Sequence, residues 1–178
     1  MMEVERKFRI KDDQSLVERL VKSGFKKSDT IHQVDKVFLT KSDSFKGFQV
    51  GDPVTRIRRN NESILLTYKR ASGTDSGIRI EHEMEVSSYA TAEGFLLEMG
   101  YKPVVTIDKI RIEYKRDNTT ITIDKVKSLG LFSEIEILCE PEQEAKAQKQ
   151  IMDTALELGL DLKDIETKHY DQLVSETI

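Results

Sequence analysis

Residues 3–10 read Glu-Val-Glu-Arg-Lys-Phe-Arg-Ile, with Glu3, Glu5 and Lys7 at every second position. Side chains two residues apart in a β-strand point to the same face, roughly 6.5 to 7 Å from each other. The stretch therefore predicts a strand that presents two carboxylates and an ammonium group side by side. This alternation decides the fold, because it recurs in most of the other strand-like segments of the chain.

Charged side chains occur at the same two-residue spacing farther along the chain. They are found at Arg56 and Arg58, at Arg79, Glu81, Glu83 and Glu85, at Lys109, Arg111, Glu113 and Lys115, and at Glu134 and Glu136. Two like charges about 6 Å apart repel by roughly 3 kcal/mol at an effective dielectric constant of about 20. Such rows are costly on a confined surface unless something neutralises them. A divalent cation suits the carboxylate rows, and a polyanion suits the Arg and Lys rows.

The composition indicates an ordered protein with a single domain, residues 1–178. Hydrophobic residues make up 38% of the chain and charged residues 34%, and the charges alternate with apolar residues instead of forming blocks. The formal net charge of -4 gives no global basic field, so we expect neither nucleic acid nor a membrane as a partner. Cys139, the only cysteine, excludes an internal disulfide and is interpreted as a buried apolar residue. The sequence starts without a leader pattern and no stretch approaches membrane length, which predicts a cytoplasmic location.

Alternating and helical patterns predict the secondary structure. Period-two alternation predicts eight strands, near residues 2–10, 30–41, 54–60, 62–70, 77–88, 103–115, 118–127 and 132–140. Apolar residues at helical spacing predict helices at 12–23, 89–99 and 142–158, with a short last helix at 170–175. Glycines that fit C-terminal helix caps follow the first three helices, at Gly24, Gly100 and Gly159.

A weak internal repeat supports a closed sheet. The run around Gly24, Val-Lys-Ser-Gly-Phe-Lys-Lys, echoes the run around Gly100, Leu-Glu-Met-Gly-Tyr-Lys-Pro. Both halves of the chain can be read as a strand, a helix and three further strands. Two such halves give eight antiparallel strands, which is enough to close a small barrel. We therefore predict an α+β fold, an eight-stranded antiparallel β-barrel or tunnel with a charged lumen and helices packed outside.

An open sheet with its charged face in solvent is the alternative explanation of the alternation. Like charges follow one another on single strands, however, whereas a solvated face generally intersperses signs to gain cross-strand pairs. Because most strands share the alternation, closing the barrel would line its lumen with charge. A polar lumen implies an ionic guest.

The chemistry of the side chains predicts which residues bind that guest. Carboxylates suit hard cations such as Mg²⁺, and we expect metal ligands at Glu3, Glu5, Asp124, Glu134 and Glu136. Guanidinium and ammonium groups suit phosphate oxygens, and we expect phosphate binding by Lys7, Arg56, Arg58, Lys69, Lys109 and Arg111. The three histidines show no metal-ligand spacing, and motifs for acyl transfer, P-loop or dinucleotide chemistry are absent.

Taken in order, these motifs resemble the CYTH superfamily of triphosphate tunnel metalloenzymes, and most of all its class IV adenylate cyclase group. The resemblance rests on Glu3-x-Glu5-x-Lys7, Arg56-x-Arg58, Leu66-Thr-Tyr-Lys69, Arg79-Ile-Glu81, Lys109-Ile-Arg111, Asp124, Gly130-Leu-Phe-Ser-Glu134-Ile-Glu136 and Lys168-His-Tyr170. It implies an eight-stranded tunnel, a Mg²⁺ or Mn²⁺ cofactor and a nucleotide or other triphosphate as substrate. It also adds Arg79 and Lys168 to the phosphate-binding set. Among all the candidates, the predicted catalytic residues are Lys7, Arg111 and Glu134.

One position departs from the pattern of the relatives. Where they commonly show an acidic, an aromatic and another acidic residue on the second strand, this chain reads Lys36-Val-Phe-Leu-Thr40. Asp35 is offset by one position, which in a strand means the opposite face. The predicted site therefore omits Asp35.

Three functions stay open at this point. The likeness implies an adenylate cyclase that converts ATP into cyclic AMP and pyrophosphate. A triphosphatase would use the same tunnel to hydrolyse inorganic tripolyphosphate, thiamine triphosphate or a nucleoside triphosphate. A non-catalytic module would bind polyphosphate or nucleotide without turnover, although the complete acidic set argues against that. Outward apolar strand faces permit a homodimer without requiring one.

Overall fold

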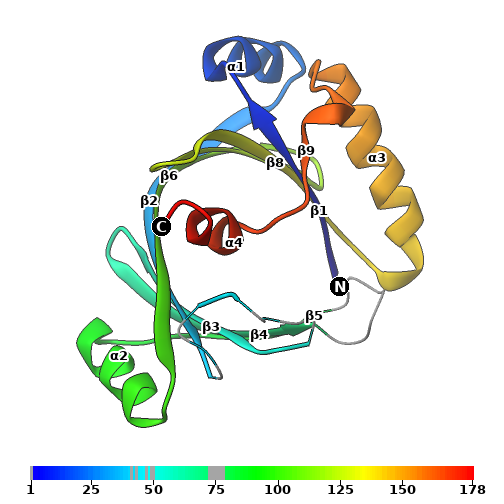
Figure 1. Ribbon diagram of the computed structural model, residues 1–178. Helices are drawn as coiled ribbons and strands as arrows, with labels where there is room; N and C mark the ends of the chain where they lie inside the picture. The colour runs from blue at the N-terminus through cyan, green and yellow to red at the C-terminus, as the bar shows by residue number, and fades with distance from the viewer. Residues whose placement is uncertain (1, 41, 43, 47, 49–50, 72–78) are drawn as a thin grey trace. The chain divides into compact units, whose positions relative to one another are not determined.

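The computed structural model describes residues 2–40, 42, 44–46, 48, 51–71 and 79–178. Within these residues the chain forms nine strands, four α-helices and two short 3-10 helices at Pro141–Gln143 and Leu162–Asp164 (Figure 1). The strands are β1 (Met2–Ile10), β2 (Lys26–Leu39), β3 (Val54–Asn60), β4 (Ser63–Ala71), β5 (Arg79–Glu85), β6 (Lys102–Arg116), β7 (Thr119–Val126), β8 (Gly130–Cys139) and β9 (Ile165–Glu166). The α-helices are α1 (Asp13–Lys22), α2 (Tyr89–Glu98), α3 (Glu144–Glu157) and α4 (Tyr170–Ser175).

The strands form one sheet in the order β5-β4-β3-β2-β6-β7-β8-β1-β9. The pairs β1–β8, β2–β3, β3–β4, β4–β5 and β7–β8 are antiparallel. Each predicted strand and helix overlaps an observed one, and the predicted α+β class is confirmed. The described part of the chain has one strand more than predicted, because β9 pairs with β1. A strand of two residues is too short to show alternation in the sequence.

The residues group into two compact units. Unit 1 contains Met1–Ile31 and Ile110–Lys168, and unit 2 contains His32–Lys109 and His169–Ile178. The long strands β2 and β6 each contribute to both units, because each passes from one unit to the other part-way along its length.

Local signals set the helix ends. The side chain of Asp12 accepts a hydrogen bond from the backbone N–H of Gln14 at 3.0 Å, and that of Ser88 accepts one from Thr91 at 3.2 Å. These caps satisfy N–H groups that lack a partner inside α1 and α2. The predicted C-terminal caps are confirmed by positive φ angles at Gly24, Gly100 and Gly159.

The hydrophobic core of unit 1 lies between one face of its sheet and the helices α1 and α3. Val4 and Phe8 of β1 point into this core, together with Leu16 and Leu20 of α1 and Ile151 of α3. Figure 1 shows α3 lying beside β1 and β8. Each fully buried Leu, Ile or Phe stabilises the fold by about 1.5–3 kcal/mol relative to an exposed one. Residues at the intervening positions of these strands point to the other face.

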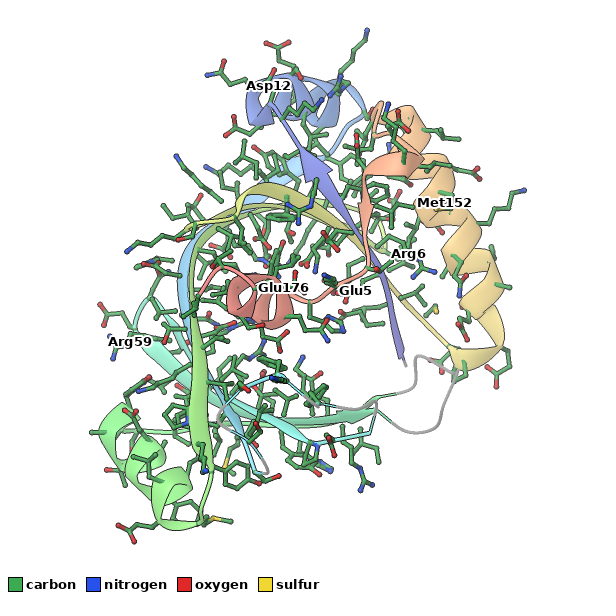
Figure 2. The ribbon with its side chains drawn as sticks, viewed as in Figure 1. Glu5, Arg6, Asp12, Arg59, Met152 and Glu176 are labelled. Carbon is green, nitrogen blue, oxygen red and sulfur yellow. The ribbon has the colours of Figure 1, made fainter. Side chains whose placement is uncertain are left out.

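The hydrophobic core of unit 2 lies between α2 and the sheet of β2, β3 and β4. Phe38 and Ile57 are fully buried there and pack with Leu96 of α2. Arg59, labelled in Figure 2, belongs to the same side of β3, and its guanidinium carbon lies 4.8 Å from the ring centre of Tyr89. The positions on either side of Ile57 point to the opposite face and carry Arg56 and Arg58.

Two smaller sequence predictions concern a cysteine and a membrane. Cys139 is buried in the core of unit 1, as predicted for a small apolar side chain. Among the residues that the structure describes, no helix is long and apolar enough to cross a membrane.

Candidate functional site

The charged face of β1 lies opposite the core of unit 1. Glu5 and Lys7 belong to this face, whereas Arg6, labelled beside Glu5 in Figure 2, belongs to the other. The antiparallel register with β8 places Glu5 opposite Glu136 and Lys7 opposite Glu134. The motifs of β1 and β8, which are far apart in the sequence, therefore meet on neighbouring strands.

Strand β7 adds an aspartate to the same face. Its register with β8 places Thr122 opposite Glu134 and Thr120 opposite Glu136. Asp124 follows on this face of β7 and is fully buried, while Glu134 is 9% exposed. The predicted metal ligands thus share one face of unit 1, and we call them the acidic cluster: Glu3, Glu5, Asp124, Glu134 and Glu136.

Arg111 of β6 is the guanidinium partner of the most buried carboxylates in the acidic cluster. Its Nε donates to Asp124 Oδ1 at 2.7 Å and its Nη2 to Asp124 Oδ2 at 2.6 Å. The same Nη2 also donates to Glu134. A buried carboxylate is costly unless it is paired and hydrogen-bonded, and Arg111 meets this requirement for both residues. The sequence predicts all three as site residues, Arg111 for phosphate and Asp124 and Glu134 for metal, but does not reveal that they bind one another.

Glu136 is a buried carboxylate with other carboxylates beside it in the acidic cluster. Burial, followed by the charge of Glu3 and a hydrogen bond shared with Glu3, raises the pKa of Glu136 to about 8. The charge of Glu5 acts in the same direction, and Arg111 opposes it. Crowded carboxylates of this kind retain protons that a bound cation would displace.

The acidic cluster fits a hard divalent cation in its donor chemistry. Mg²⁺ and Mn²⁺ prefer carboxylate oxygens, and Mg²⁺ needs only one or two of them together with water and substrate phosphates. In the described part of the chain, no three His, Cys, Asp or Glu side chains already form a ligand group around one point. The fit therefore rests on the oxygen donors and on the charges of Glu3 and Glu5, which add to burial in raising the pKa of Glu136.

Lys7 and Lys168 occupy different environments near β9. Lys7 is 8% exposed and pairs in register with Glu166 of β9. Burial alone raises the pKa of Glu166, but the backbone N–H of Lys168 and the charges of Arg9 and Lys7 lower it below the ordinary value. The side chain of Lys168 is exposed, and its backbone N–H donates to Glu166 Oε1 at 3.0 Å. Lys7 therefore lies among the charged residues of unit 1, and Lys168 lies at the surface after β9.

A second charged face in unit 2 contains a buried aspartate and two arginines. Arg58 Nε donates to Asp35 Oδ1 and Arg58 Nη2 to Asp35 Oδ2, both at 2.7 Å. Burial alone raises the pKa of Asp35, but the hydrogen bonds and charge of Arg58, with the charges of Arg56 and Lys109, lower it below the ordinary value. Asp35 is therefore an anion held by cations.

The prediction that Asp35 faces away from the charged row is wrong. That prediction compared the position of Asp35 with the pattern of the relatives and took an offset of one residue to mean the opposite face of β2. The face is set instead by pairing with β3, where Asp35 lies opposite Arg58. Lys36 points to the α2 side and binds Glu93. The sequence does hold one signal for the observed face. Asp35 lies on the strand before Arg56-x-Arg58, and its negative charge complements the two arginines.

Arg56 lies on the same face as Arg58. Its Nη1 is 3.8 Å from Asp35 Oδ2, and its Nη2 is 3.3 Å from Thr67 Oγ1 and 3.6 Å from Glu83 Oε2. Its Nε is buried and has no hydrogen-bond acceptor among the residues that the structure describes. Burial, and then the charge of Arg58, lower the pKa of the Arg56 guanidinium. An anion that enters this face would satisfy a donor that the protein leaves without an acceptor.

Lys109 completes the cationic group of unit 2. It is 3% exposed, and its ammonium nitrogen lies 4.7 Å from the ring centre of Tyr170 at the start of α4. Tyr170 was part of the sequence motif set, but the motif did not predict its contact. We call the group the basic cluster: Asp35, Arg56, Arg58 and Lys109.

The remaining predicted phosphate ligands of unit 2 lie on β4 and β5. Lys69 Nζ binds Glu81 Oε2 at 2.9 Å, as their register across β4 and β5 requires. Arg79 pairs with Ala71 in the sheet, and its side chain lies outside the described part of the chain. Lys69 therefore lies on the strand next to Arg56 and Arg58, and its ammonium group is paired with Glu81.

The sequence matches the CYTH domain family over residues 1–170. The chain belongs to the CYTH family. The resemblance predicted from its motifs is thereby confirmed. A relative of this CYTH protein from Methanocaldococcus jannaschii, named "Putative adenylate cyclase", is 31% identical over 175 residues, which cover 97% of this chain and 98% of the relative.

Solved structures match this CYTH protein along nearly its whole length. The PH1819 protein of Pyrococcus horikoshii OT3 is 28% identical with a TM-score of 0.83, and the match covers 99% of this chain and 100% of that one. HpAC1 of Hippeastrum, named "Putative adenylyl cyclase" and described as revealing a dominant triphosphatase activity, is 20% identical with a TM-score of 0.65, and the match covers 97% of this chain and 93% of that one. The first match confirms the predicted CYTH fold, and the second, at its lower identity, shows the fold alone.

Proposed function

We propose that this CYTH protein is a metal-dependent enzyme acting on a triphosphate, and that its reaction converts ATP into cyclic AMP and pyrophosphate. The observation that carries the proposal is the division of charge between a carboxylate-rich face in unit 1 and a buried group of cations in unit 2. Carboxylates suit a hard cation, and guanidinium groups suit phosphate oxygens. The name of the 31% identical relative supports the choice of a cyclase. The proposal also takes residues 1–178 as a single domain in the cytoplasm.

The acidic cluster is the proposed metal site. Its side chains would hold Mg²⁺ or Mn²⁺ through Glu3, Glu5, Asp124, Glu134 and Glu136. When bound, such a cation neutralises phosphate charge and lowers the pKa of a coordinated hydroxyl group. Lys7 and Arg111 stabilise the negative charge that develops on phosphate oxygens, and Glu134 holds the guanidinium of Arg111 in place.

The basic cluster is the proposed phosphate site. Its guanidinium and ammonium groups bind phosphate oxygens through Arg56, Arg58 and Lys109. The buried Nε of Arg56 supplies a donor that awaits an acceptor. The further proposed phosphate ligands are Lys69, Arg79 and Lys168.

In the cyclase reaction the ribose 3′-oxygen forms a bond to the α-phosphorus of ATP. The bond from the α-phosphorus to the oxygen that bridges to the β-phosphate breaks, and pyrophosphate leaves with the electron pair. The proton of the 3′-hydroxyl passes to water. The protein contributes positioning and charge neutralisation, and we assign no side chain among the described residues as general base.

A triphosphatase is the second candidate. In that reaction water attacks the terminal phosphorus of inorganic tripolyphosphate, thiamine triphosphate or a nucleoside triphosphate. The side chains of both clusters are of the types that bind phosphate and metal, and this chemistry serves either reaction. The Hippeastrum protein, with its dominant triphosphatase activity, has the same fold, so the fold alone does not select the reaction.

Product analysis decides between these candidates. The protein is incubated with ATP, GTP, thiamine triphosphate and tripolyphosphate, each with Mg²⁺ and with Mn²⁺, and products are separated by chromatography. We expect cyclic AMP and pyrophosphate from ATP. ADP and phosphate without cyclic AMP would reject the cyclase, and faster turnover of tripolyphosphate than of ATP would establish the hydrolase. Binding of all four compounds without any product would leave only a non-catalytic binding module.

A further inference from the structure

The carboxylate of Asp35 lies at the centre of the basic cluster. Only 3% of the residue is exposed, and each carboxylate oxygen accepts a hydrogen bond of 2.7 Å from Arg58. Two parallel hydrogen bonds fix both the position and the plane of a guanidinium group. Arg58 therefore cannot turn within this face without breaking both bonds.

Asp35 serves more than one cation. Arg56 Nη1 lies 3.8 Å from Asp35 Oδ2, and the charge of Lys109 also acts on this carboxylate. Three cations in a buried region repel one another strongly unless an anion lies among them. The carboxylate of Asp35, together with the charges of Glu81 and Glu83 on Arg56, makes their burial tolerable, and the buried Nε of Arg56 still has no acceptor among the described residues.

The Asp35–Arg58 pair is not part of the hydrophobic core of unit 2. That core, with Phe38 and Ile57, lies on the opposite face of the same strands. A buried ion pair is also weak grounds for stability, because apolar replacements of similar volume are often neutral or stabilising. A purely structural role therefore does not explain why this position holds a buried Asp35–Arg58 ion pair. A role in anion binding does explain it.

We propose that Asp35 is a positioning residue for phosphate binding: its carboxylate holds the guanidinium of Arg58 beside Arg56 and Lys109 in the orientation that binds a phosphate group. The inference rests on the proposed function, because it requires the basic cluster to bind phosphate. Removing the charge of Asp35 weakens phosphate binding, even though it takes a negative charge away from an anion site. A residue that acted only through its charge would have the opposite effect.

Isothermal titration calorimetry with inorganic tripolyphosphate and Mg²⁺ tests the proposal in a double-mutant cycle of Asp35→Asn and Arg58→Lys. We expect Asp35→Asn to raise the dissociation constant about tenfold, which is a typical coupling for residues in contact. In the Arg58→Lys background, where no bidentate pair exists, the same change should alter it less than about twofold. Equal or tighter binding by Asp35→Asn, or an equal loss in both backgrounds, would overturn the proposal.

Two further proteins keep the result interpretable. Glu157→Gln removes a carboxylate that binds Arg116 through two hydrogen bonds of 2.9 and 3.0 Å on the exterior of unit 1, and it should leave tripolyphosphate binding unchanged. If Asp35→Asn does not fold, Asp35→Glu keeps the charge but displaces the carboxylate, and it should still weaken binding; unchanged binding by Asp35→Glu would overturn the proposal. Failure of the wild-type protein to bind tripolyphosphate would instead reject the proposed function.

Discussion

The charged faces of the two units contain the same ion pair in opposite surroundings. In unit 1 the Nε and Nη2 of Arg111 bind the two oxygens of Asp124, and in unit 2 the Nε and Nη2 of Arg58 bind those of Asp35. Around Arg111 the other residues of the acidic cluster are carboxylates. Around Asp35 the other residues of the basic cluster are cations.

This difference determines what each face lacks. In the acidic cluster the guanidinium of Arg111 also binds Glu134, and the pKa of Glu136 is still raised to about 8 by burial and the neighbouring carboxylates. In the basic cluster the pKa of Arg56 is lowered by burial and by Arg58, and no residue in the described part of the chain accepts a hydrogen bond from its Nε. Each face, considered by itself, therefore suits an ion of the opposite sign: a cation on the face of unit 1 and an anion on the face of unit 2.

The largest expected effect follows from neutralising a carboxylate in the acidic cluster. Glu134→Gln should lower metal-dependent turnover by about 100-fold or more, as removal of a preorganised electrostatic contact commonly does. The variant should fold, because Arg111 keeps its two hydrogen bonds to Asp124. Steady-state kinetics with Mg²⁺ and with Mn²⁺ measure the effect, and circular dichroism checks the fold. Wild-type turnover in this variant would remove Glu134 from the metal site.

A smaller effect is expected from the basic cluster, and β3 offers a matched control for it. Arg56→Gln should raise the KM for the triphosphate by roughly 10- to 100-fold, because a charge-assisted hydrogen bond contributes about 1.5–3 kcal/mol. Arg59→Gln changes an arginine on the opposite face, over the ring of Tyr89, and should leave KM unchanged. Equal effects of the two substitutions would mean that the faces of β3 do not differ in function.

The sequence predicted the two faces because alternation is a local property of a strand. The spacing of Glu3, Glu5 and Lys7 correctly indicated a charged face on β1, and the core on the other face followed from Val4 and Phe8. The strand β9 is not predictable from the sequence, because its two residues are too few to show the alternation of a β-strand. The helix ends were predictable from single glycines, whose positive φ angles are local as well.

Which charges neutralise one another could not be predicted, because that depends on register between strands. The motif offset predicts the wrong face for Asp35, because it does not include the pairing of Asp35 with Arg58 on the neighbouring strand. Arg111 and Asp124 were assigned to different ligands, phosphate and metal, although the structure shows them bound to each other. Cross-strand register is non-local, and a shift of one residue exchanges the two faces of a strand.

Stability should depend on pH through Glu136 in the metal-free protein. The folded-state pKa is raised from 4.5 to about 8, so the contribution to stability is fully present below 4.5 and is lost as the pH rises through 8. Glu136→Gln should therefore melt at about the same temperature as the wild type below pH 4.5 and at a higher temperature above pH 8, with a difference of about 2–4 °C for each kcal/mol of stability that the wild type loses. Differential scanning calorimetry between these pH values measures the difference.

Adding Mg²⁺ to the same melting experiment tests whether the acidic cluster binds a cation. A divalent cation that binds the folded acidic cluster stabilises it by linkage and relieves the repulsion around Glu136. Mg²⁺ should raise the melting temperature of the wild type more than that of Glu136→Gln at pH 8. An equal rise in both proteins would place the cation elsewhere, and a melting temperature of Glu136→Gln below that of the wild type at pH 8 would contradict the raised pKa of Glu136 itself.

The smallest expected effect comes from the ion pair of Arg116 and Glu157, which is joined by two hydrogen bonds and belongs to neither charged face. Hydrogen bonds from Arg116 lower the pKa of Glu157, so its contribution to stability is present above the ordinary value of 4.5 and is lost as the pH falls through the lower folded-state value. The pair is partly exposed, with 30% and 41% of the two side chains accessible, and solvent limits its value to about 0.2–1 kcal/mol. Urea unfolding of Glu157→Gln at pH 7 should show a loss within this range that disappears at acidic pH, with no change in catalysis. A loss of turnover in Glu157→Gln would mean that the exterior of unit 1 takes part in the reaction. The functional difference between the two charged faces and the surface ion pairs would then be wrong.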